Sequence, residues 1–148
     1  MATYIRNKKA TFNYEILETF EAGVVLFGYE VKAIRSGKAS LVGAYIILKE
    51  DGAYLKGATV SFYQEKNTPD SYNPERERKL LLSKKELLKL EKELNTAGLT
   101  IVPISLYSKN SKIKLEIALV RGKKKVDKRE TLKKRDVKRD IDRILKTQ

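Results

Sequence analysis

The stretch TIVPISLYSKNSKIKLEIALV, residues 100–120, decides the expected fold. In its second half a large apolar residue stands at every other position from 113 to 119, with lysines, a glutamate and an alanine between them. This period of two is typical of a β-strand with one buried face. A polar break separates it from a first extended run, so the whole stretch predicts a hairpin. Pro103 lacks a backbone donor, which places its strand at a sheet edge or at a bulge.

Shorter runs on the N-terminal side also favour strands. Residues 14–20 and 24–27 are rich in apolar side chains, and AYIILKEDGAYLKGATV, residues 44–60, holds two extended runs. Asp51-Gly52 joins these two runs and is a favoured two-residue hairpin turn.

Two segments have helical spacing instead. The first has apolar residues at positions 27, 31 and 34 and ends at Gly37. The second begins with Ser83 and Glu86, a capping box. Its apolar stripe and closing glycine are Leu87, Leu90, Leu94, Ala97 and Gly98.

About six short strands with one or two helices predict a mainly β fold with accessory helices, of the α+β class. A small OB-like antiparallel barrel is the favoured version, because this barrel is common among proteins that bind nucleic acids. The polar segment 64–78 contains two prolines and is expected to be a long loop.

The charge of the chain points to a polyanionic partner. The 148 residues carry a formal net charge of +13, and nucleic acid is the first candidate for such a protein. Residues 121–148 alone hold 13 Lys or Arg and 5 Asp or Glu, with no aromatic residue and one glycine. Such a segment cannot build a core of its own. We therefore expect a barrel domain over residues 1–121 and a basic tail over residues 122–148.

The composition also excludes several chemistries. The chain has no cysteine and no histidine. Disulfides, thiolate metal sites and nucleophiles activated by histidine are therefore impossible. No phosphate-binding loop, dinucleotide motif or metal-ligand cluster occurs, so we expect no cofactor and no metal. No apolar run is long enough to span a membrane and no signal core opens the chain, so the cytoplasm is the expected compartment.

Three places in the body are candidate RNA contacts. Glu21 precedes Ala22-Gly23, where a turn is expected, and its carboxylate either caps that turn or accepts a hydrogen bond from a guanine edge or a ribose hydroxyl. A basic cluster formed by Arg76, Arg78 and Lys79 either binds phosphate or lies in a solvated loop. The three leucines that follow at 80–82 cannot all face one side of a core, so either at least one is exposed to a partner or, more simply, they form a buried strand-like run.

The tail has two readings. It is either a disordered polybasic arm or a segment that is disordered when free and helical on a partner. An apolar stripe supports the second reading, because a purely electrostatic arm does not need one. The members of this stripe are Val137, Ile141, Ile144 and Leu145.

Several separated motifs resemble one family. The stretches NKKA, FEAGVVLFGYEVKAIRSGKAS, NPERERKLLLS and GKKKVDKR followed by KKRD occur in an order and spacing similar to those of the SsrA-binding proteins, also called small protein B. The resemblance covers the chain from about residue 7 to its end. It implies a bacterial protein with an OB-like six-stranded barrel that is not an enzyme. Such a protein acts as a monomer, binds the tRNA-like part of transfer-messenger RNA and delivers it to stalled ribosomes for trans-translation and the tagging of incomplete peptides.

The resemblance also assigns roles to residues. Its RNA-contacting positions correspond to Glu21, Leu81 and Ser83 and to a junction motif, Gly122, Lys123 and Lys124. Many relatives carry an asparagine in place of Ser83. In the tail, Asp127, Lys128 and Arg129 match a motif tied to ribosome function, and the tail is expected to fold as a helix in the empty message channel near the decoding centre. Its other expected contacts with the ribosome are Lys133, Lys134, Arg135, Lys138 and Arg139.

Two other functions stay open from the residues alone. A structural ribosomal or ribosome-assembly protein would share the charge and the barrel. An enzyme acting on RNA through carboxylates and a metal would need a tight group of Asp and Glu, and the sequence shows none.

Overall fold

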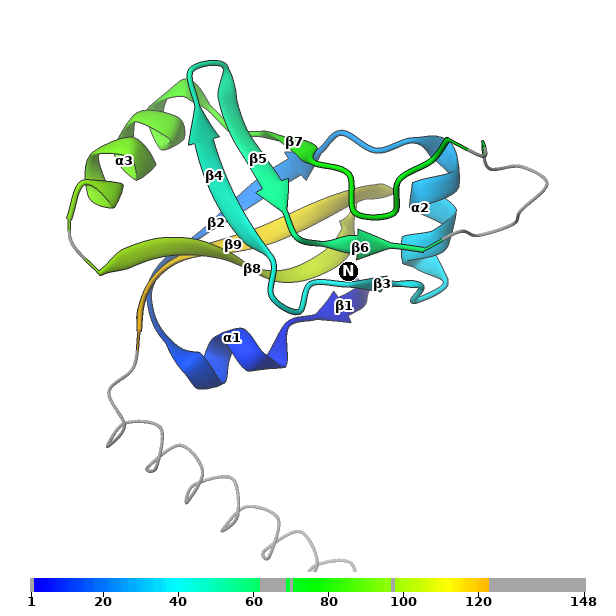
Figure 1. The fold of residues 1–148 in the computed structure, drawn as a ribbon, viewed down its shortest axis with the longest axis horizontal. Coiled ribbons are helices and arrows are strands. Elements are labelled where there is room, and N and C mark those ends of the chain that lie inside the picture. Colours follow the sequence, from blue (N-terminus) through cyan, green and yellow to red (C-terminus); the bar gives the residue numbers. More distant parts are fainter. Residues whose placement is uncertain (1, 62–68, 70, 97, 123–148) are drawn as a thin grey trace, which may run out of the picture.

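The computed structural model describes residues 2–61, 69, 71–96 and 98–122 (Figure 1). The expected tail, and with it each tail residue named above from Lys123 onward, lies outside the described residues, as does most of residues 62–70.

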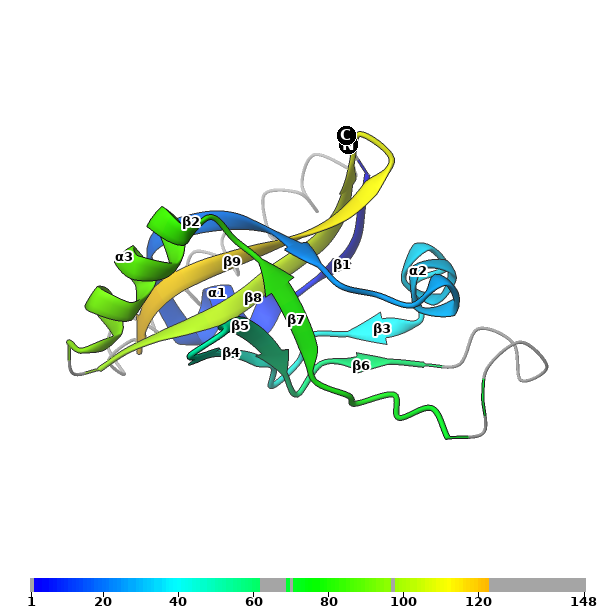
Figure 2. The same cartoon turned by 90° about the horizontal axis from the view of Figure 1, so that it is seen from above.

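A curved antiparallel sheet forms the centre of the described chain. It has seven strands, and β4 also lies against β8, so that the sheet curls back on itself as a partly open barrel (Figures 1 and 2). In spatial order the strands are β1 (Thr3–Arg6), β8 (Leu99–Lys109), β9 (Lys112–Gly122), β2 (Tyr14–Val24), β7 (Arg78–Leu81), β5 (Gly52–Lys56) and β4 (Tyr45–Lys49).

Two very short strands form a separate ladder beside this sheet. They are β3 (Ala39–Ser40) and β6 (Thr59–Val60). The expected class, mainly β with accessory helices, is confirmed, but the main sheet has one strand more than the six expected. A four-residue strand such as β1 and two-residue strands such as β3 and β6 are too short to give a clear period in the sequence.

The β8–β9 hairpin is the longest element and confirms the prediction from residues 100–120. Its alternate residues Ile113, Leu115 and Ile117 are buried. The pairing of the two strands shifts between Pro103 and Ser105, which is the bulge expected at the proline. The hairpin turns at Asn110 and Ser111, which adopt φ values of 52° and 65° without a glycine.

The β4–β5 hairpin is also confirmed, but its turn lies one residue earlier than expected. Lys49 pairs with Gly52, so Glu50 and Asp51 form the turn and Gly52 belongs to β5. Gly52 has a φ of 140°, a conformation that favours glycine.

β2 differs from its prediction. A turn was expected between the runs 14–20 and 24–27. Instead, residues 14–24 form one continuous strand that passes through Ala22 and Gly23 without a turn. Pairing with β9, which shifts register once between Ile16 and Glu18 and runs on to Gly23–Lys114, holds the strand extended. Gly23 is therefore needed for another reason, which is the close approach of a side chain from β7.

Three helices flank the sheet. The two expected ones are confirmed as α2 (Gly28–Arg35) and α3 (Lys84–Leu94), which lie at opposite ends of the sheet (Figure 1). A third, α1 (Lys8–Asn13), was not predicted because it is only six residues long and buries a single alanine, Ala10.

The main core lies between the inner face of the curled sheet and the helices α2 and α3, and Ala10 of α1 belongs to a separate, smaller apolar cluster. Ala22 of β2, Leu80 of β7 and Leu115 of β9 point into the main core and are almost completely buried. The next residues along each of these strands point outward, and that outer face holds the candidate site.

Candidate nucleic-acid interface

Glu21 and Leu81 lie on the same outer face of the sheet. Gly23 pairs directly with Leu81 across the β2–β7 ladder. Glu21 is two residues before Gly23, and residues two apart on a strand share a face. The structure therefore brings together two positions that the sequence separates by sixty residues.

Glu21 does not cap a turn, because it stands in the middle of β2. Its Oε2 accepts a hydrogen bond of 2.6 Å from the Tyr107 hydroxyl and lies 3.3 Å from Lys109 Nζ. The hydrogen bond from Tyr107 is the main cause that lowers the pKa of Glu21, and Lys109 lowers it further against the opposing effect of burial. In return, burial and the same hydrogen bond raise the pKa of Tyr107. The carboxylate is thus ionised and already neutralised by a lysine, so it does not repel a phosphate nearby.

Leu81 is exposed because its neighbour across the ladder is a glycine. Its side chain lies over Gly23, where an added Cβ would come within 3.1 Å of Leu81 Cβ. The side chain is 56% exposed, whereas the preceding Leu80 is 2% exposed. This confirms that the leucines at 80–82 do not share one face and leaves Leu81 open to a partner.

Ser83 is the N-cap of α3. Its Oγ accepts the Glu86 backbone N–H at 3.2 Å, and the Glu86 carboxylate accepts the Ser83 backbone N–H at 3.1 Å. The predicted capping box is therefore confirmed. Ser83 is exposed and follows Leu81 by two residues, so antiparallel pairing places it at the same end of the β2–β7 ladder as Glu21.

The prediction that Arg78 binds phosphate is wrong, because its side chain is only 1% exposed. Its Nε donates to Glu30 Oε2 at 2.9 Å, and its terminal nitrogens donate to backbone carbonyls at Ala58, Arg76 and Pro74. Arg78 therefore serves the fold, and its donors are used inside the protein.

Arg76 is held by the same carboxylate but stays partly exposed. Its Nε and a terminal nitrogen donate to Glu30, and its guanidinium lies 4.1 Å from the ring centroid of Phe27. Lys79, the third member of the basic cluster, is half-buried on the outer face and pairs with Tyr54 of β5. Of the three basic residues, Arg76 and Lys79 thus reach the surface.

Glu30 is the residue that sequence reasoning missed. It is completely buried and also accepts the Tyr72 hydroxyl at 2.9 Å and the Phe27 backbone N–H at 2.8 Å. Burial acts to raise the pKa of Glu30, but hydrogen bonds from Arg76, Phe27 and Arg78 outweigh it and lower the pKa. Two features of the sequence indicate this network. One is an acidic residue on the face of α2 that packs inward, and the other is a pair of arginines in the segment that was expected to be a loop.

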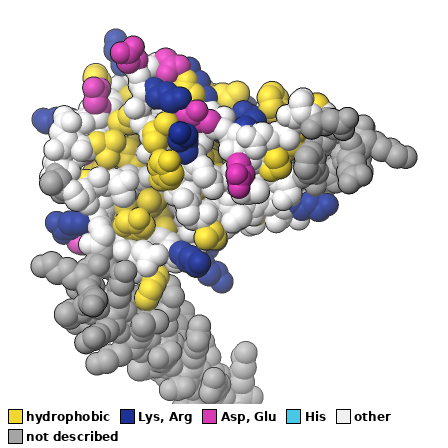
Figure 3. Space-filling view, in the orientation of Figure 1, with side chains coloured by type: hydrophobic (Ala, Val, Ile, Leu, Met, Phe, Trp, Pro, Cys, Tyr) yellow, Lys and Arg dark blue, Asp and Glu magenta, His cyan; other side chains and the backbone are white. Residues whose placement is uncertain are grey.

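Tyr107, Lys109 and Lys114 were also missed as parts of the site. The outer face of the hairpin could have identified them, since they share the period-two register of residues 105–116. Figure 3 shows one face of the molecule, on which Lys and Arg side chains and several Asp and Glu side chains lie among separate groups of apolar ones.

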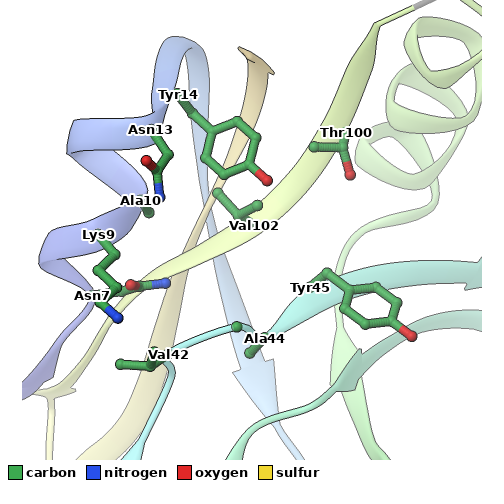
Figure 4. Close-up of a pocket in the computed structure, with 11 residues that line it drawn as sticks. Asn7, Lys9, Ala10, Asn13, Tyr14, Val42, Ala44, Tyr45, Thr100 and Val102 are labelled. Atoms are coloured by element: carbon green, nitrogen blue, oxygen red, sulfur yellow. The ribbon is translucent and has the colours of Figure 1, made fainter. Parts of the chain in front are cut away.

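A separate cleft of about 480 Å³ lies between α1, the start of β4 and β8 (Figure 4). Tyr14 and Tyr45 stand on either side of it, and Lys9 and Asn13 add polar groups at its α1 side. None of its lining residues is acidic, so it offers no carboxylate for a metal or for acid–base chemistry. Across the described part of the chain, no group of three or more Asp, Glu, His or Cys could hold a metal ion.

Gly122 is the first residue of the junction motif, and the structure describes it but not Lys123 and Lys124. It pairs with Tyr14 at the end of the β2–β9 ladder and is exposed. The sheet therefore includes the first residue that was assigned to the tail.

None of the three described helices is long and apolar enough to cross a membrane.

Comparisons with known proteins agree with this architecture. The sequence model of a family described as "SmpB protein" matches residues 4–147. An SsrA-binding protein of Mesoplasma florum is 51% identical over 133 residues, which are 90% of this chain and 89% of the relative. One of Chlorobaculum tepidum is 45% identical over 145 residues, which are 97% of this chain and 92% of the relative.

A solved structure is similar as well. It is described as "tmRNA-SmpB: a journey to the center of the bacterial ribosome" and is 36% identical, with a TM-score of 0.69. The match covers 88% of this chain and 95% of that one. With a family match over nearly the whole sequence and relatives near half identity, the chain belongs to the SmpB protein family.

Proposed function

We propose that this chain binds the tRNA-like domain of transfer-messenger RNA and delivers it to stalled ribosomes for trans-translation. Membership of the family carries this proposal: the relatives are SsrA-binding proteins, and the similar solved structure joins tmRNA, SmpB and the ribosome in its description. In this role the chain is a binding adaptor and not a catalyst.

The outer face around Glu21 and Leu81 is the part of the body that we assign to the RNA. Leu81 supplies exposed apolar area, and Lys79 and Lys114 flank it on the neighbouring register positions. Lysines contribute point charges for phosphates, whereas the leucine can pack on a ribose or a base. Ser83, at the same end of the ladder, can offer its hydroxyl as well.

Glu21 acts in this interface through its neighbours. Its Oε2 accepts from the Tyr107 hydroxyl, and both carboxylate oxygens accept from Lys109 Nζ at 3.3 and 3.4 Å, so Glu21 holds these two groups on the outer face. A Glu21→Gln variant keeps the size of the side chain and loses the charge. We expect it to bind the RNA more weakly while its thermal unfolding stays unchanged, as measured by fluorescence anisotropy and by circular dichroism. A collapse of thermal stability instead would mean that Glu21 is structural.

The tail, residues 123–148, is proposed to act on the ribosome rather than in RNA capture. Its basic residues suit a channel lined with phosphate, and its apolar stripe suits a helix that forms there. Asp127, Lys128 and Arg129, with the lysines and arginines between 133 and 139, are the proposed contacts.

The decisive experiment is to purify the tagged full chain from its source cells and sequence the RNA that accompanies it. We expect transfer-messenger RNA to dominate, with ribosomes present well below one copy per protein. A structural ribosomal protein would instead bring ribosomal RNA in equal amounts and no enrichment of transfer-messenger RNA, and that result would contradict the proposal.

A further inference from the structure

An exposed apolar stripe continues beyond Leu81 along the chain that leaves β2. Val25 is 46% exposed and Phe27 is 47% exposed, values close to that of Leu81. The alternate residues, Val24 and Leu26, pack on the core instead. The period of two therefore persists past the end of β2, and it turns Val25 and Phe27 to the same outer side as Gly23.

Backbone contacts fix this extension next to β7. The Val25 N–H donates to the Lys79 carbonyl at 2.9 Å and so prolongs the pairing that begins at Gly23–Leu81. Phe27 is still extended, with φ −77° and ψ 157°, before α2 begins. The stripe is thus a rigid continuation of the face that holds Leu81.

The ring of Phe27 is in contact with a positively charged side chain. The Arg76 guanidinium lies 4.1 Å from its ring centroid, within the range of a cation–π contact. Arg76 donates to Glu30 and to the Val25 carbonyl, and these bonds hold the guanidinium beside the Phe27 ring while its side chain stays 22% exposed. The other neighbour of the ring is Tyr29, at 5.4 Å between centroids.

Basic residues lie beside the stripe. Lys79 lies opposite Val25, and Lys114 pairs with Gly23. The acid nearest to Phe27, Glu30, is completely buried and shared by two arginines, so the network keeps one positive charge in excess. Flat apolar surface beside cations is the combination that single-stranded nucleic acid recognises through base stacking and phosphate contacts.

We propose that an unstacked nucleotide of the bound RNA stacks on the Phe27–Arg76 surface, so that the RNA interface extends from Glu21 and Leu81 to the start of α2. This inference rests on the proposed function, because it takes the RNA already bound at Leu81 as the source of the nucleotide. Continuity with Leu81 and the positive charge favour an RNA over an apolar protein segment as the occupant.

Tryptophan fluorescence can report on this site, because the chain contains no tryptophan of its own. A full-length Phe27→Trp variant has a single indole at the proposed stacking site, and stacking on a base quenches indole emission. We expect a saturating concentration of the tRNA-like fragment of transfer-messenger RNA to quench this emission. A Tyr45→Trp variant is the matched control, because Tyr45 is similarly exposed (44%) but lies outside the stripe, and its emission should not be quenched.

The affinities of further Phe27 and Tyr45 variants for the RNA fragment complete the test. Loss of one stacked base costs about 1–3 kcal/mol, so Phe27→Ala should weaken binding of the RNA fragment by about 5- to 150-fold. Phe27→Leu, which keeps apolar area without an aromatic face, should restore only part of this loss, and Tyr45→Ala should change nothing. Thermal unfolding of each variant shows whether the fold is kept, and the emission of the Phe27→Trp variant does not depend on a truncated side chain.

Unchanged emission of the Phe27→Trp variant at saturating RNA, with normal affinity for the RNA, would overturn this inference and leave the proposed function standing. Quenching by ribosomes but not by the RNA fragment would also overturn it, because the occupant would then be a different molecule. If the unchanged chain itself fails to bind the RNA fragment, the proposed function fails instead.

Discussion

Glu30 is buried and accepts hydrogen bonds from four different residues, Phe27, Tyr72, Arg76 and Arg78. It joins α2 to the segment 72–78 through Tyr72, Arg76 and Arg78, and that segment leads directly into β7. Because two arginines share one carboxylate, its removal would leave buried positive charge without a partner. The network therefore fixes the position of Leu81 from behind, although none of its buried members contacts the RNA in our proposal.

We expect Glu30→Ala to lower the free energy of unfolding by about 3–5 kcal/mol, the usual cost of breaking a buried ion pair on one side. Urea unfolding followed by circular dichroism measures the loss. Glu15→Ala is the control, because Glu15 and Arg121 form an ion pair with both side chains more than half exposed. Such a pair is worth less than about 1 kcal/mol. Equal losses in the two variants would contradict the assignment.

The same residue predicts a pH dependence. The pKa of Glu30 in the folded protein lies below its ordinary value of 4.5. A carboxylate with a lowered pKa stabilises the fold fully above that value, and the stabilisation is lost as the pH falls through the lower, folded-state pKa. We expect the free energy of unfolding to fall below pH 4.5, and to fall less steeply in a Glu30→Gln variant. Parallel curves for the two proteins would exclude Glu30 as a source of the acid sensitivity.

Gly23 gives a test of how Leu81 is presented. An alanine there would place its Cβ 3.1 Å from Leu81 Cβ and 3.3 Å from Leu81 Cδ1, closer than side chains normally approach. Leu81 Cβ can move away only if the β7 backbone shifts, so we expect Gly23→Ala to displace Leu81 at some cost in stability and to weaken RNA binding. Gly28→Ala serves as the control, since no atom lies within 4 Å of an added Cβ at that position. Unchanged RNA affinity in Gly23→Ala would show that the placement of Leu81 is not critical.

Among the elements, α3 shows how one residue can have two roles. The capping box at its start depends on the Ser83 hydroxyl, and the amphipathic stripe of the helix packs on the sheet through Leu90, which is completely buried. The capping box stabilises the first turn of α3 at a point where β7 has ended only two residues earlier. The helix therefore begins directly after the strand that carries Leu81.

Ser83→Ala removes the cap and should cost about 1 kcal/mol of stability. Ser83→Asn should keep the stability, because asparagine caps a helix as well as serine does. Unfolding curves separate these outcomes, and RNA affinity adds the second role: asparagine should restore or strengthen binding where alanine weakens it. If both variants bind the RNA like the unchanged chain, Ser83 is a cap and no more.

At the scale of the whole molecule, we expect a division of labour between the body and the tail. Deleting residues 123–148 keeps the complete β2–β9 ladder, which ends at Gly122. The shortened chain should keep much of its RNA affinity and lose the ability to restart stalled ribosomes in a reconstituted translation assay. If the body contacts roughly six phosphates, its binding constant should fall with salt at a log–log slope of about −4 to −5. Loss of RNA binding together with rescue would contradict the division.

The sequence by itself determined the local elements with a strong period or a clear cap. The β8–β9 hairpin, its bulge at Pro103, the β4–β5 hairpin and α3 were all predicted, because period-two alternation, a proline and a capping box act within a few residues. Glu21 and Leu81 were proposed as RNA contacts through resemblance to a family, and the structure places them on one face of the sheet. The absence of histidine and cysteine limited the chemistry before any fold was known.

Only the tertiary structure decided which of the basic residues are available to RNA. Arg76, Arg78 and Lys79 look alike in the sequence, yet one is buried on Glu30, one is pinned over Phe27 and one lies on the outer face. The partner that separates them comes from α2, more than forty residues away, and no local pattern carries that information. A charged side chain is buried or exposed according to the neutralising group it meets, and such meetings are made by packing between distant segments.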